Sequence, residues 1–342
     1  MLDELERYTR QTIFPGIGPD GQRRLLAARV VLVGCGADGT VIADRLVRAG
    51  VGQLTIIDRD FIELNNLQRQ LLFDEDDLAA NLPKAVAAER KLRRINSQVT
   101  VTGLVSDLNP ENAEALLADA DLVMDGTDNF ETRYLINDVC VKHAIPWVYC
   151  GVVASYGMTM TIVPHQTPCL RCVFPETPLP GAIATCDTAG IANPIVSVVA
   201  GIAAAEGIKL LVGKGERNRG TIYVDLWDNT YDVFENEAPR PDCPTCAMGS
   251  YPFLAGEQSG QAVSLCGRSA VHIRAAAGRP LSLGDLAKRL GAVSQVSAAN
   301  EYLVRFKVGD YDITVFADGR AIIKGTGDET VARSLYAKYI GL

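Results

Sequence analysis

The stretch VVLVGCGADG at residues 30–39 decides the fold, and LTIID at residues 54–58 supports it. The first four residues are all apolar, as in a strand that is buried on both faces. The glycines that follow predict a tight turn opening a helix that runs to about Gly50. LTIID predicts a second strand, which ends in the carboxylate of Asp58. Strand, glycine-rich turn, helix and strand are typical of half a nucleotide-binding α/β fold.

Strands continue to alternate with helices as far as about Gly151. Pro83 suits the first turn of a further helix, which runs to about Ile95. The other predicted strands lie near residues 99–105, 122–125 and 147–152, and helices near 110–118 and 130–144. This order predicts an α/β fold with a doubly wound, Rossmann-like, mostly parallel sheet. Residues 156–163 and 221–227 alternate like antiparallel strands, so we expect the sheet to continue into antiparallel strands.

Two domains are expected. The first spans residues 1–248, and GSYPFLAGEQSGQA at 249–262 has the composition of a linker. Residues 263–342 then show their own order of strands and helices, which predicts a small C-terminal α+β domain.

Composition narrows the range of partners. The 342 residues are 48% hydrophobic and carry a net charge of −8. This balance argues against a nucleic acid or an anionic membrane as the main partner. The apolar stretch 194–212 is almost long enough to span a bilayer, but it contains Glu206 and Lys209, so a buried helix at a subunit interface is expected. The charged first ten residues do not resemble a signal peptide, and we expect a cytoplasmic protein whose nine cysteines are reduced.

Two short cysteine pairs predict a metal site. Cys169 and Cys172 form one CxxC pair, and Cys243 and Cys246 form the other. Four thiolates in two such pairs suit the closed tetrahedral cage of a structural Zn²⁺ ion. A closed cage has no open coordination position, so the chemistry is expected elsewhere.

The glycine-rich turn and the polar residues after the second strand predict a nucleotide site. Glycines let backbone N–H groups approach phosphates, and an acidic residue such as Asp58 can bind a ribose. These features do not separate NAD from ATP. The stretch NNLQRQ at 65–70 adds amides and Arg69, and Lys84 opens the next helix. Two cations near the strand ends favour a triphosphate.

The next strand ends in DGTDN at 125–129, which can hold a magnesium ion between phosphate oxygens. Asp128 is the predicted ligand, although either Asp128 or Asn129 could instead cap the following helix. Asp38 in the glycine-rich turn is expected to point outward, where it would favour the positive end of its helix.

These motifs together resemble the ThiF/MoeB family, the bacterial relatives of ubiquitin-activating enzymes. The resemblance covers roughly residues 5–248. Its motifs occur in the family's order: RYTRQ at 7–11, the glycine-rich loop, Asp58-x-Asp60 with NNLQRQ, PKA at 83–85, GTDN, the two CxxC pairs, and TCDTAG at 185–190.

The resemblance implies an adenylyltransferase that uses MgATP. Arg10 would reach the phosphates of the other subunit of a homodimer, and the four cysteines would bind structural Zn²⁺. Asp58 would bind the ribose, and Asp128 would bind Mg²⁺. Phosphate and nucleotide contacts would come from the following residues: Gly34, Gly36, Ala37, Gly39, Asp60, Asn65, Asn66, Arg69, Lys84 and Asn129.

The implied substrate is the C-terminal glycine of a small ubiquitin-like sulfur-carrier protein ending in Gly-Gly. Its adenylation would lead to a thiocarboxylate for thiamine or molybdopterin biosynthesis, with sulfur supplied by a donor protein. Cys186 is the candidate for a covalent link to the carrier, and a packing role is its alternative. Two other functions stay open: an NAD-dependent oxidoreductase, which would share the glycine-rich turn, and a non-catalytic scaffold that binds carriers.

Overall fold

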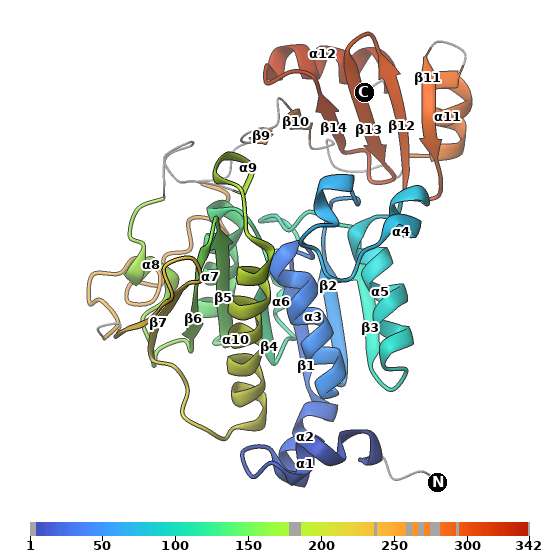
Figure 1. The fold of residues 1–342 in the computed structure, drawn as a ribbon. Coiled ribbons are helices and arrows are strands. Elements are labelled where there is room, and N and C mark those ends of the chain that lie inside the picture. The colour runs from blue at the N-terminus through green and yellow to red at the C-terminus, as the bar shows by residue number, and fades with distance from the viewer. Residues whose placement is uncertain are drawn as a thin grey trace. The chain divides into compact units, whose positions relative to one another are not determined.

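The computed structural model describes residues 5–177, 186–235, 238–257, 262–265, 270–273, 281–291 and 294–340. It contains two compact units (Figure 1). The larger takes in most of the chain up to Ser259, and the smaller takes in the C-terminal part from Gly260.

The larger unit is built on an eight-stranded sheet in the order β3-β2-β1-β4-β5-β6-β7-β8. The first five strands in this order are parallel, and β6, β7 and β8 continue the sheet as antiparallel strands. The prediction of a mostly parallel sheet with an antiparallel continuation is therefore confirmed, although the exposed edge strand β8 was not predicted. The strands are β1 (Arg29–Val33), β2 (Gln53–Ile57), β3 (Thr100–Leu104), β4 (Leu122–Asp125), β5 (Trp147–Val153), β6 (Tyr156–Ile162), β7 (Gly220–Asp225) and β8 (Thr230–Glu235).

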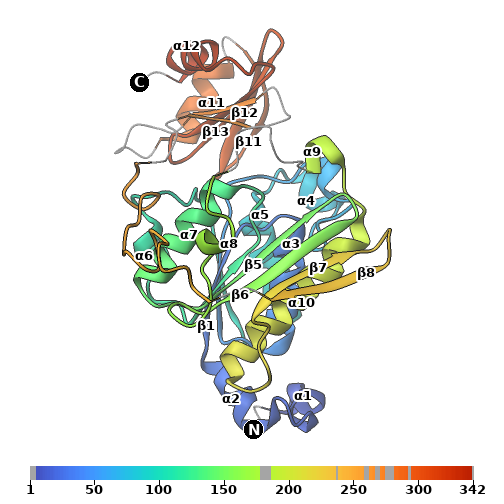
Figure 2. The same ribbon diagram turned by 90° about the vertical axis from the view of Figure 1, so that its left-hand side faces the viewer.

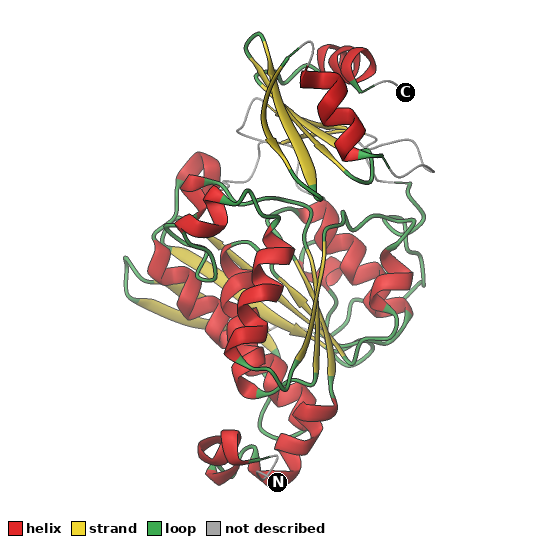
Figure 3. Ribbon diagram, turned by 90° about the vertical axis from the view of Figure 1, so that its right-hand side faces the viewer, coloured by secondary structure: helices red, strands yellow, loops and turns green. Residues whose placement is uncertain are grey.

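Helices cover both faces of this sheet (Figure 3). One face carries α3 (Ala37–Ala49), α5 (Lys84–Ile95) and α10 (Asn193–Val212), and the other carries α6 (Ala113–Leu117) and α7 (Phe130–Lys142). By length and composition α10 could cross a bilayer, but half of its most apolar window is buried inside the protein. The shorter helices are η1 (Glu6–Tyr8), α1 (Thr9–Ile13), α2 (Gly18–Ala27), η2 (Leu64–Asn66), α4 (Glu75–Ala79), α8 (Leu170–Val173) and α9 (Cys186–Ala189).

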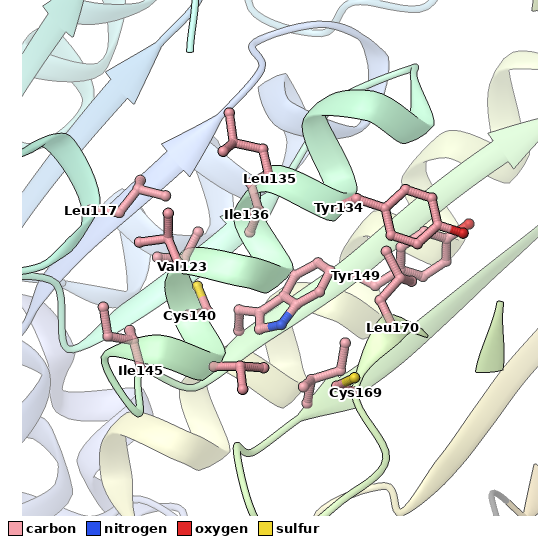
Figure 4. Close-up of a cluster of buried hydrophobic side chains, with 14 of the residues drawn as sticks. Leu117, Val123, Tyr134, Leu135, Ile136, Cys140, Ile145, Tyr149, Cys169 and Leu170 are labelled. Atoms are coloured by element: carbon pink, nitrogen blue, oxygen red, sulfur yellow. The ribbon is translucent and has the colours of Figure 1, made fainter. Parts of the chain in front are cut away.

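A core of large side chains fills the space between the sheet and α7 (Figure 4). Trp147 is fully buried, and Tyr134 of α7 stacks on Phe253 with ring centroids 4.8 Å apart. Fully burying one large apolar side chain contributes about 1.5–3 kcal/mol. Phe253 belongs to the stretch whose composition resembles a linker, so the first part of that stretch packs on the larger unit.

The smaller unit has a six-stranded sheet in the order β11-β12-β13-β14-β10-β9, and every pair for which a register is defined is antiparallel. Its own core joins Phe306 and Ile313 of the sheet to Leu286 and Tyr336 of two helices. The predicted α+β class of this part is confirmed. Its elements are β9 (Ala262–Leu265), β10 (Ala270–Ile273), α11 (Leu283–Gly291), β11 (Gln295–Ala299), β12 (Leu303–Val308), β13 (Tyr311–Phe316), β14 (Ala321–Lys324) and α12 (Glu329–Tyr339).

Candidate functional site

The glycine-rich turn after β1 packs directly against the loop after β4. Gly34 has φ +86°, and a Cβ added there would lie 2.5 Å from the carbonyl oxygen of Gly126. A Cβ at Gly39 would lie 2.1 Å from the carbonyl oxygen of Gly34. Both positions therefore require glycine. Gly36 and Ala37 lie between them, at the N-terminus of α3, where free backbone N–H groups favour an anion.

Asp58 ties this turn to the end of β2. Its Oδ2 accepts the N–H of Cys35 at 2.6 Å, and its Oδ1 accepts the N–H of Asp60 at 2.7 Å. The side chain is buried at 8% exposure. Asp58 therefore fixes the conformation of the turn, and its carboxylate oxygens keep lone pairs for a further donor such as a ribose hydroxyl.

Lys84 brings a positive charge to the same strand ends. It is the first residue of α5, is only 7% exposed, and places its Nζ 3.3 Å from Oδ2 of Asp60. Burial lowers the pKa of the ammonium, but Asp60, Asp58 and Asp128 raise it above its ordinary value. Lys84 thus stays charged, and Asp128 lies close enough to act on it.

The NNLQRQ segment holds its own shape through its side chains. Oδ1 of Asn66 accepts the N–H of Glu63 at 3.1 Å, and Nδ2 of Asn66 donates to Oδ1 of Asn65 at 3.1 Å. The Arg69 guanidinium donates to the carbonyl oxygen of Asn65 at 2.7 Å. Gln70 is buried beside Gly36, and its Oε1 accepts no hydrogen bond from the described part of the chain. Gln70 is therefore a further site residue. The sequence alone did not distinguish it from the other polar residues of NNLQRQ.

At the end of β4, Asn129 and Asp128 take different positions. Oδ1 of Asn129 accepts the N–H of Thr132 at 2.9 Å and so caps α7. Asp128 is exposed, and its carboxylate contacts the Asn129 amide at the long distance of 3.5 Å. The capping alternative therefore applies to Asn129, which leaves Asp128 open to a ligand.

Arg133 is a site residue that the sequence reasoning missed. It is 6% exposed and donates to Oδ2 of Asp125 at 3.0 Å, to the carbonyl oxygen of Thr127 at 2.6 Å and to that of Cys150 at 3.1 Å. It thereby fixes the loop that carries Asp128. Arg133 lies one helical turn after Asn129, and this spacing is the only feature of the sequence that could have indicated its place in the site.

Asp38 does not point outward, so that expectation is wrong. The side chain is 5% exposed, and its Oδ1 accepts no hydrogen bond from any described residue. The carboxyl group is turned toward Arg133, Asp125 and Cys150 beneath the turn instead of toward water. Burial raises its pKa to about 7, and the negative charge of Asp125 adds to the increase while Arg133 opposes it.

This burial gives a prediction about stability and pH. The native chain holds a proton on Asp38 that the unfolded chain releases, so stability is lost as pH rises from about 4 toward 7. Asp38→Leu and Asp38→Asn should both stabilise the protein. Their advantage over wild type should grow by about 2 kcal/mol between pH 5.5 and 7.5. Urea denaturation at the two pH values measures this difference, and an advantage that does not change with pH would contradict the assignment.

The four cysteines of the CxxC pairs do come together. Their sulfurs lie within 4.8 Å of one another, and three of the separations are 3.8, 3.6 and 3.4 Å. Tetrahedral zinc with Zn–S bonds of about 2.3 Å requires sulfurs about 3.8 Å apart, so the donor set fits that ion. A hydrogen bond from Cys169, with help from the Arg240 N–H, lowers the pKa of Cys172 to about 5.

Helix α7 connects this cage to the strand ends. Oδ1 of Asn137 accepts the N–H of Leu170 at 2.9 Å, between the first two cysteines. Asp138 accepts the hydroxyl of Thr245, between the other two cysteines, at 3.3 Å. Helix α7, which follows Asp128 and its cap Asn129, is thus held by both cysteine loops through residues in its second half.

Arg10 lies at the opposite end of the sheet from these residues. Nε2 of its neighbour Gln11 donates to the carbonyl oxygen of Ala49 at 2.9 Å, at the C-terminal end of α3. The glycine-rich turn lies at the N-terminal end of that 13-residue helix, about 20 Å away at 1.5 Å per residue. An arginine side chain cannot span this distance, so the fold does not bring Arg10 to the site of its own chain.

Cys186 begins α9, but its side chain lies outside the described residues. The structure therefore places its backbone near the sheet and does not place its sulfur.

Known proteins resemble this chain in sequence and in fold. The model of the ThiF family matches residues 8–245. The chain is 46% identical over 336 residues to the sulfur carrier protein ThiS adenylyltransferase of Bacillus subtilis, covering 98% of this chain and 99% of that protein. It is 39% identical over 252 residues to the sulfur carrier protein adenylyltransferase of Thermus thermophilus, covering 71% and 91%. Among solved structures, E. coli MccB with ATP aligns with a TM-score of 0.62 at 25% identity, covering 71% of this chain and 75% of that chain.

Proposed function

Because this chain belongs to the ThiF family, we propose that it uses ATP to adenylate the C-terminal glycine of a small ubiquitin-like sulfur carrier. It is an adenylyltransferase of the ThiF/MoeB type, and its named relatives act on sulfur carriers. The NAD-dependent oxidoreductase is set aside, since the relatives reported above are adenylyltransferases. The thiocarboxylate that follows from adenylation would serve thiamine or molybdopterin biosynthesis.

The single observation that carries the proposal is the convergence of charge beyond the ends of β2 and β4. Buried Lys84 and Asp58 lie beside the half-buried Asp60, and Asp128 acts on the same lysine. The reaction brings the carboxylate of the carrier onto the α-phosphate of ATP and expels pyrophosphate. Both partners are anions, so cations fixed at this point offset their repulsion and align the reacting atoms.

Each site residue has a role in this scheme. The N–H groups of Gly36 and Ala37 at the N-terminus of α3 would face phosphate oxygens, and Asp58 would accept a ribose hydroxyl. Lys84, Arg69 and Asn66 would hold the phosphates. Asp128 would hold Mg²⁺, which supplies charge neutralisation when bound. Carrier-dependent exchange of labelled pyrophosphate into ATP tests the whole scheme, and its absence with every candidate carrier would favour the scaffold alternative.

The free edge of the sheet is a suitable docking surface for the carrier. Every residue of β8 is exposed, including Tyr231 at 59% and Phe234 at 57%, and β8 lies at the edge of the sheet (Figure 2). Trp227 is 79% exposed in the β7–β8 turn. The register of β5, β6 and β7 places this turn at the same end of the sheet as the nucleotide residues. An unpaired strand edge with exposed aromatic rings suits a β-rich partner.

Removal of the Trp227 side chain from this turn should therefore weaken carrier binding. Trp227→Ala is expected to raise the KM for the carrier about tenfold or more, because exposed aromatic anchors often contribute 2 kcal/mol or more at interfaces. The affinity for ATP should not change. Met248→Ala removes another exposed side chain, 66% accessible, in the second cysteine loop and serves as control. An unchanged KM for the carrier in Trp227→Ala would remove this surface from the scheme.

The four-cysteine cage would hold one structural Zn²⁺ per chain. Cys246→Ser should give soluble protein with less zinc and a melting temperature lower by several degrees, because metal binding contributes to folding free energy. Metal analysis of the wild type should give about one zinc per chain. A wild-type protein free of tightly bound metal would contradict the cage.

We propose that the enzyme is a homodimer. One side of α10 presents a stripe of small and apolar residues, of which Pro194, Val198 and Ala205 are exposed and Gly201 is half-buried. Ile13 and Phe14, which follow Arg10 closely, are 66% and 59% exposed. A second copy covering these surfaces would bring Arg10 to the other subunit's phosphates. A separate protein would donate the sulfur, and reduced thiols suit a cytoplasmic setting.

A further inference from the structure

Two polar side chains of the NNLQRQ segment are buried, and only one of them has its hydrogen bonds. Asn66 is 2% exposed, and both atoms of its amide are bonded within the segment. Gln70 is 3% exposed, and neither Oε1 nor Nε2 makes a hydrogen bond to any described residue. A buried amide without partners is unfavourable, because its hydrogen bonds to water in the unfolded chain are not replaced. The fold therefore gains nothing from this amide, which points to a ligand that it contacts.

The Gln70 amide lies beside the N-terminus of α3. A Cβ added at Gly36, the N-cap of that helix, would lie 3.9 Å from Nε2 of Gln70 and 3.9 Å from the carbonyl oxygen of Gly126. These are ordinary van der Waals distances, whereas the corresponding distances are 2.5 Å at Gly34 and 2.1 Å at Gly39. This side of Gly36 therefore has room for a further atom, next to the amide and to the N–H groups that open the helix.

The backbone around Gln70 is fixed to the same helix. The N–H of Gln70 donates to the carbonyl oxygen of Asn66 at 2.9 Å. The N–H of Leu71 donates to Oγ1 of Thr40, in the first turn of α3, at 3.1 Å, and the Thr40 hydroxyl donates to the carbonyl oxygen of Ala37 at 2.9 Å. These bonds are made within the protein, so the fold itself positions Gln70. A donor that is positioned in advance binds a ligand at a lower entropic cost.

A phosphate oxygen is the ligand atom that suits this position. It accepts hydrogen bonds and is negatively charged, so both the N–H group of Nε2 and the N-terminus of α3 favour it. A ribose hydroxyl would be neutral and would gain little from the helix end. Asp58, whose carboxylate accepts hydrogen bonds, is the better partner for the ribose.

We propose that Gln70 contacts the nucleotide directly, with Nε2 donating to a phosphate oxygen at the N-terminus of α3. Gln70 then stabilises bound ATP and does not stabilise the free fold. It adds an uncharged donor to the two cations, Lys84 and Arg69. This inference rests on the proposed function, since it requires that ATP binds at the glycine-rich turn.

The test measures two properties of Gln70→Met on the full chain: the melting temperature without nucleotide, and the affinity for MgATP by calorimetry without a carrier. Methionine has a similar size but no N–H donor. The melting temperature should rise by about 2 °C, because a buried unpaired amide is removed. The affinity for MgATP should fall about tenfold or more, because a hydrogen bond to a charged group is lost. Gln70→Glu places a carboxylate beside the phosphate and should bind MgATP more weakly still.

Gln22→Met is the matched control for stability. Gln22 is a fully buried glutamine near the other end of α3, where its Nε2 donates to the carbonyl oxygen of Ala49 at 2.9 Å and its Oε1 accepts from Gln11 at 2.6 Å. Its replacement should lower the melting temperature by several degrees, because both partners lose a hydrogen bond. A fall of the same size in Gln70→Met would mean that Gln70 supports the fold, and it would overturn the inference.

The affinity of wild type for MgATP separates the inference from the proposed function. If wild type binds MgATP and supports exchange, and Gln70→Met or Gln70→Glu binds equally well, Gln70 does not contact the nucleotide and the proposed function stands. If wild type does not bind MgATP, the proposed function fails together with the role of Gln70.

Discussion

Asp128→Ala is expected to lose carrier-dependent ATP–pyrophosphate exchange by about a thousandfold or more. A divalent metal stabilises the charge of the transition state by several kcal/mol, and each 1.4 kcal/mol is a factor of ten in rate. The exposed carboxylate contributes little to the fold, since the Asn129 amide donates to it only at the long distance of 3.5 Å. The melting temperature should therefore stay within a degree or two of wild type.

The control for this variant is Asp119→Ala. Asp119 is also exposed and precedes the same strand, β4, but it lies at the opposite end of that strand. Its exchange rate should equal that of wild type. If Asp128→Ala keeps more than a tenth of wild-type exchange at saturating Mg²⁺, Asp128 is not the metal ligand, and the strand-end carboxylates would have to be reassigned.

Arg10→Ala should also be nearly inactive, and mixing it with Asp128→Ala should restore activity. Arg10 lies about 20 Å along α3 from the turn of its own chain, so a contact between Arg10 and phosphates would require a second subunit. An arginine supplied across an interface is worth roughly 10³ or more in related phosphoryl chemistry. In a mixed dimer, one site carries both lesions and the other carries neither. Each heterodimer should therefore recover about half of the wild-type rate, by the symmetry of a two-site dimer.

Subunit exchange must be verified before the rate is interpreted. Differently tagged variants can be mixed, purified through both tags and assayed for exchange. Recovery should appear only in the doubly tagged fraction. Verified heterodimers without activity would show that Arg10 supports its own chain, and a monomer at micromolar concentration would contradict the dimer on which the prediction depends.

The sequence by itself determined the class of the larger fold. Alternating strands and helices imply parallel strands, and the glycines at 34 and 39 stand where backbone from the loop after β4 and from the turn itself leaves no room for a side chain. The alternation of apolar and polar residues and the contact between Gly39 and Gly34 are local, so single residues and their spacing express them. The spacing of the cysteines likewise indicated a four-sulfur cage, because two CxxC pairs each present two ligands to one ion.

Only the tertiary structure decided the environment of each side chain. Helix polarity alone suggested that Asp38 would face solvent, whereas packing of the turn against the β4 loop buries it near Asp125. Asp128 and Asn129 are equally suitable helix caps by residue type, and only the structure shows that Asn129 takes this role. The structure also reveals the buried contact of Arg133 with Asp125 and the bond between Asn193 and Gln68, which the sequence pattern does not express. Local sequence pattern predicts secondary structure because helices and strands depend mainly on neighbouring residues. The burial and hydrogen bonding of a side chain depend instead on the distant segments that the fold brings into contact with it.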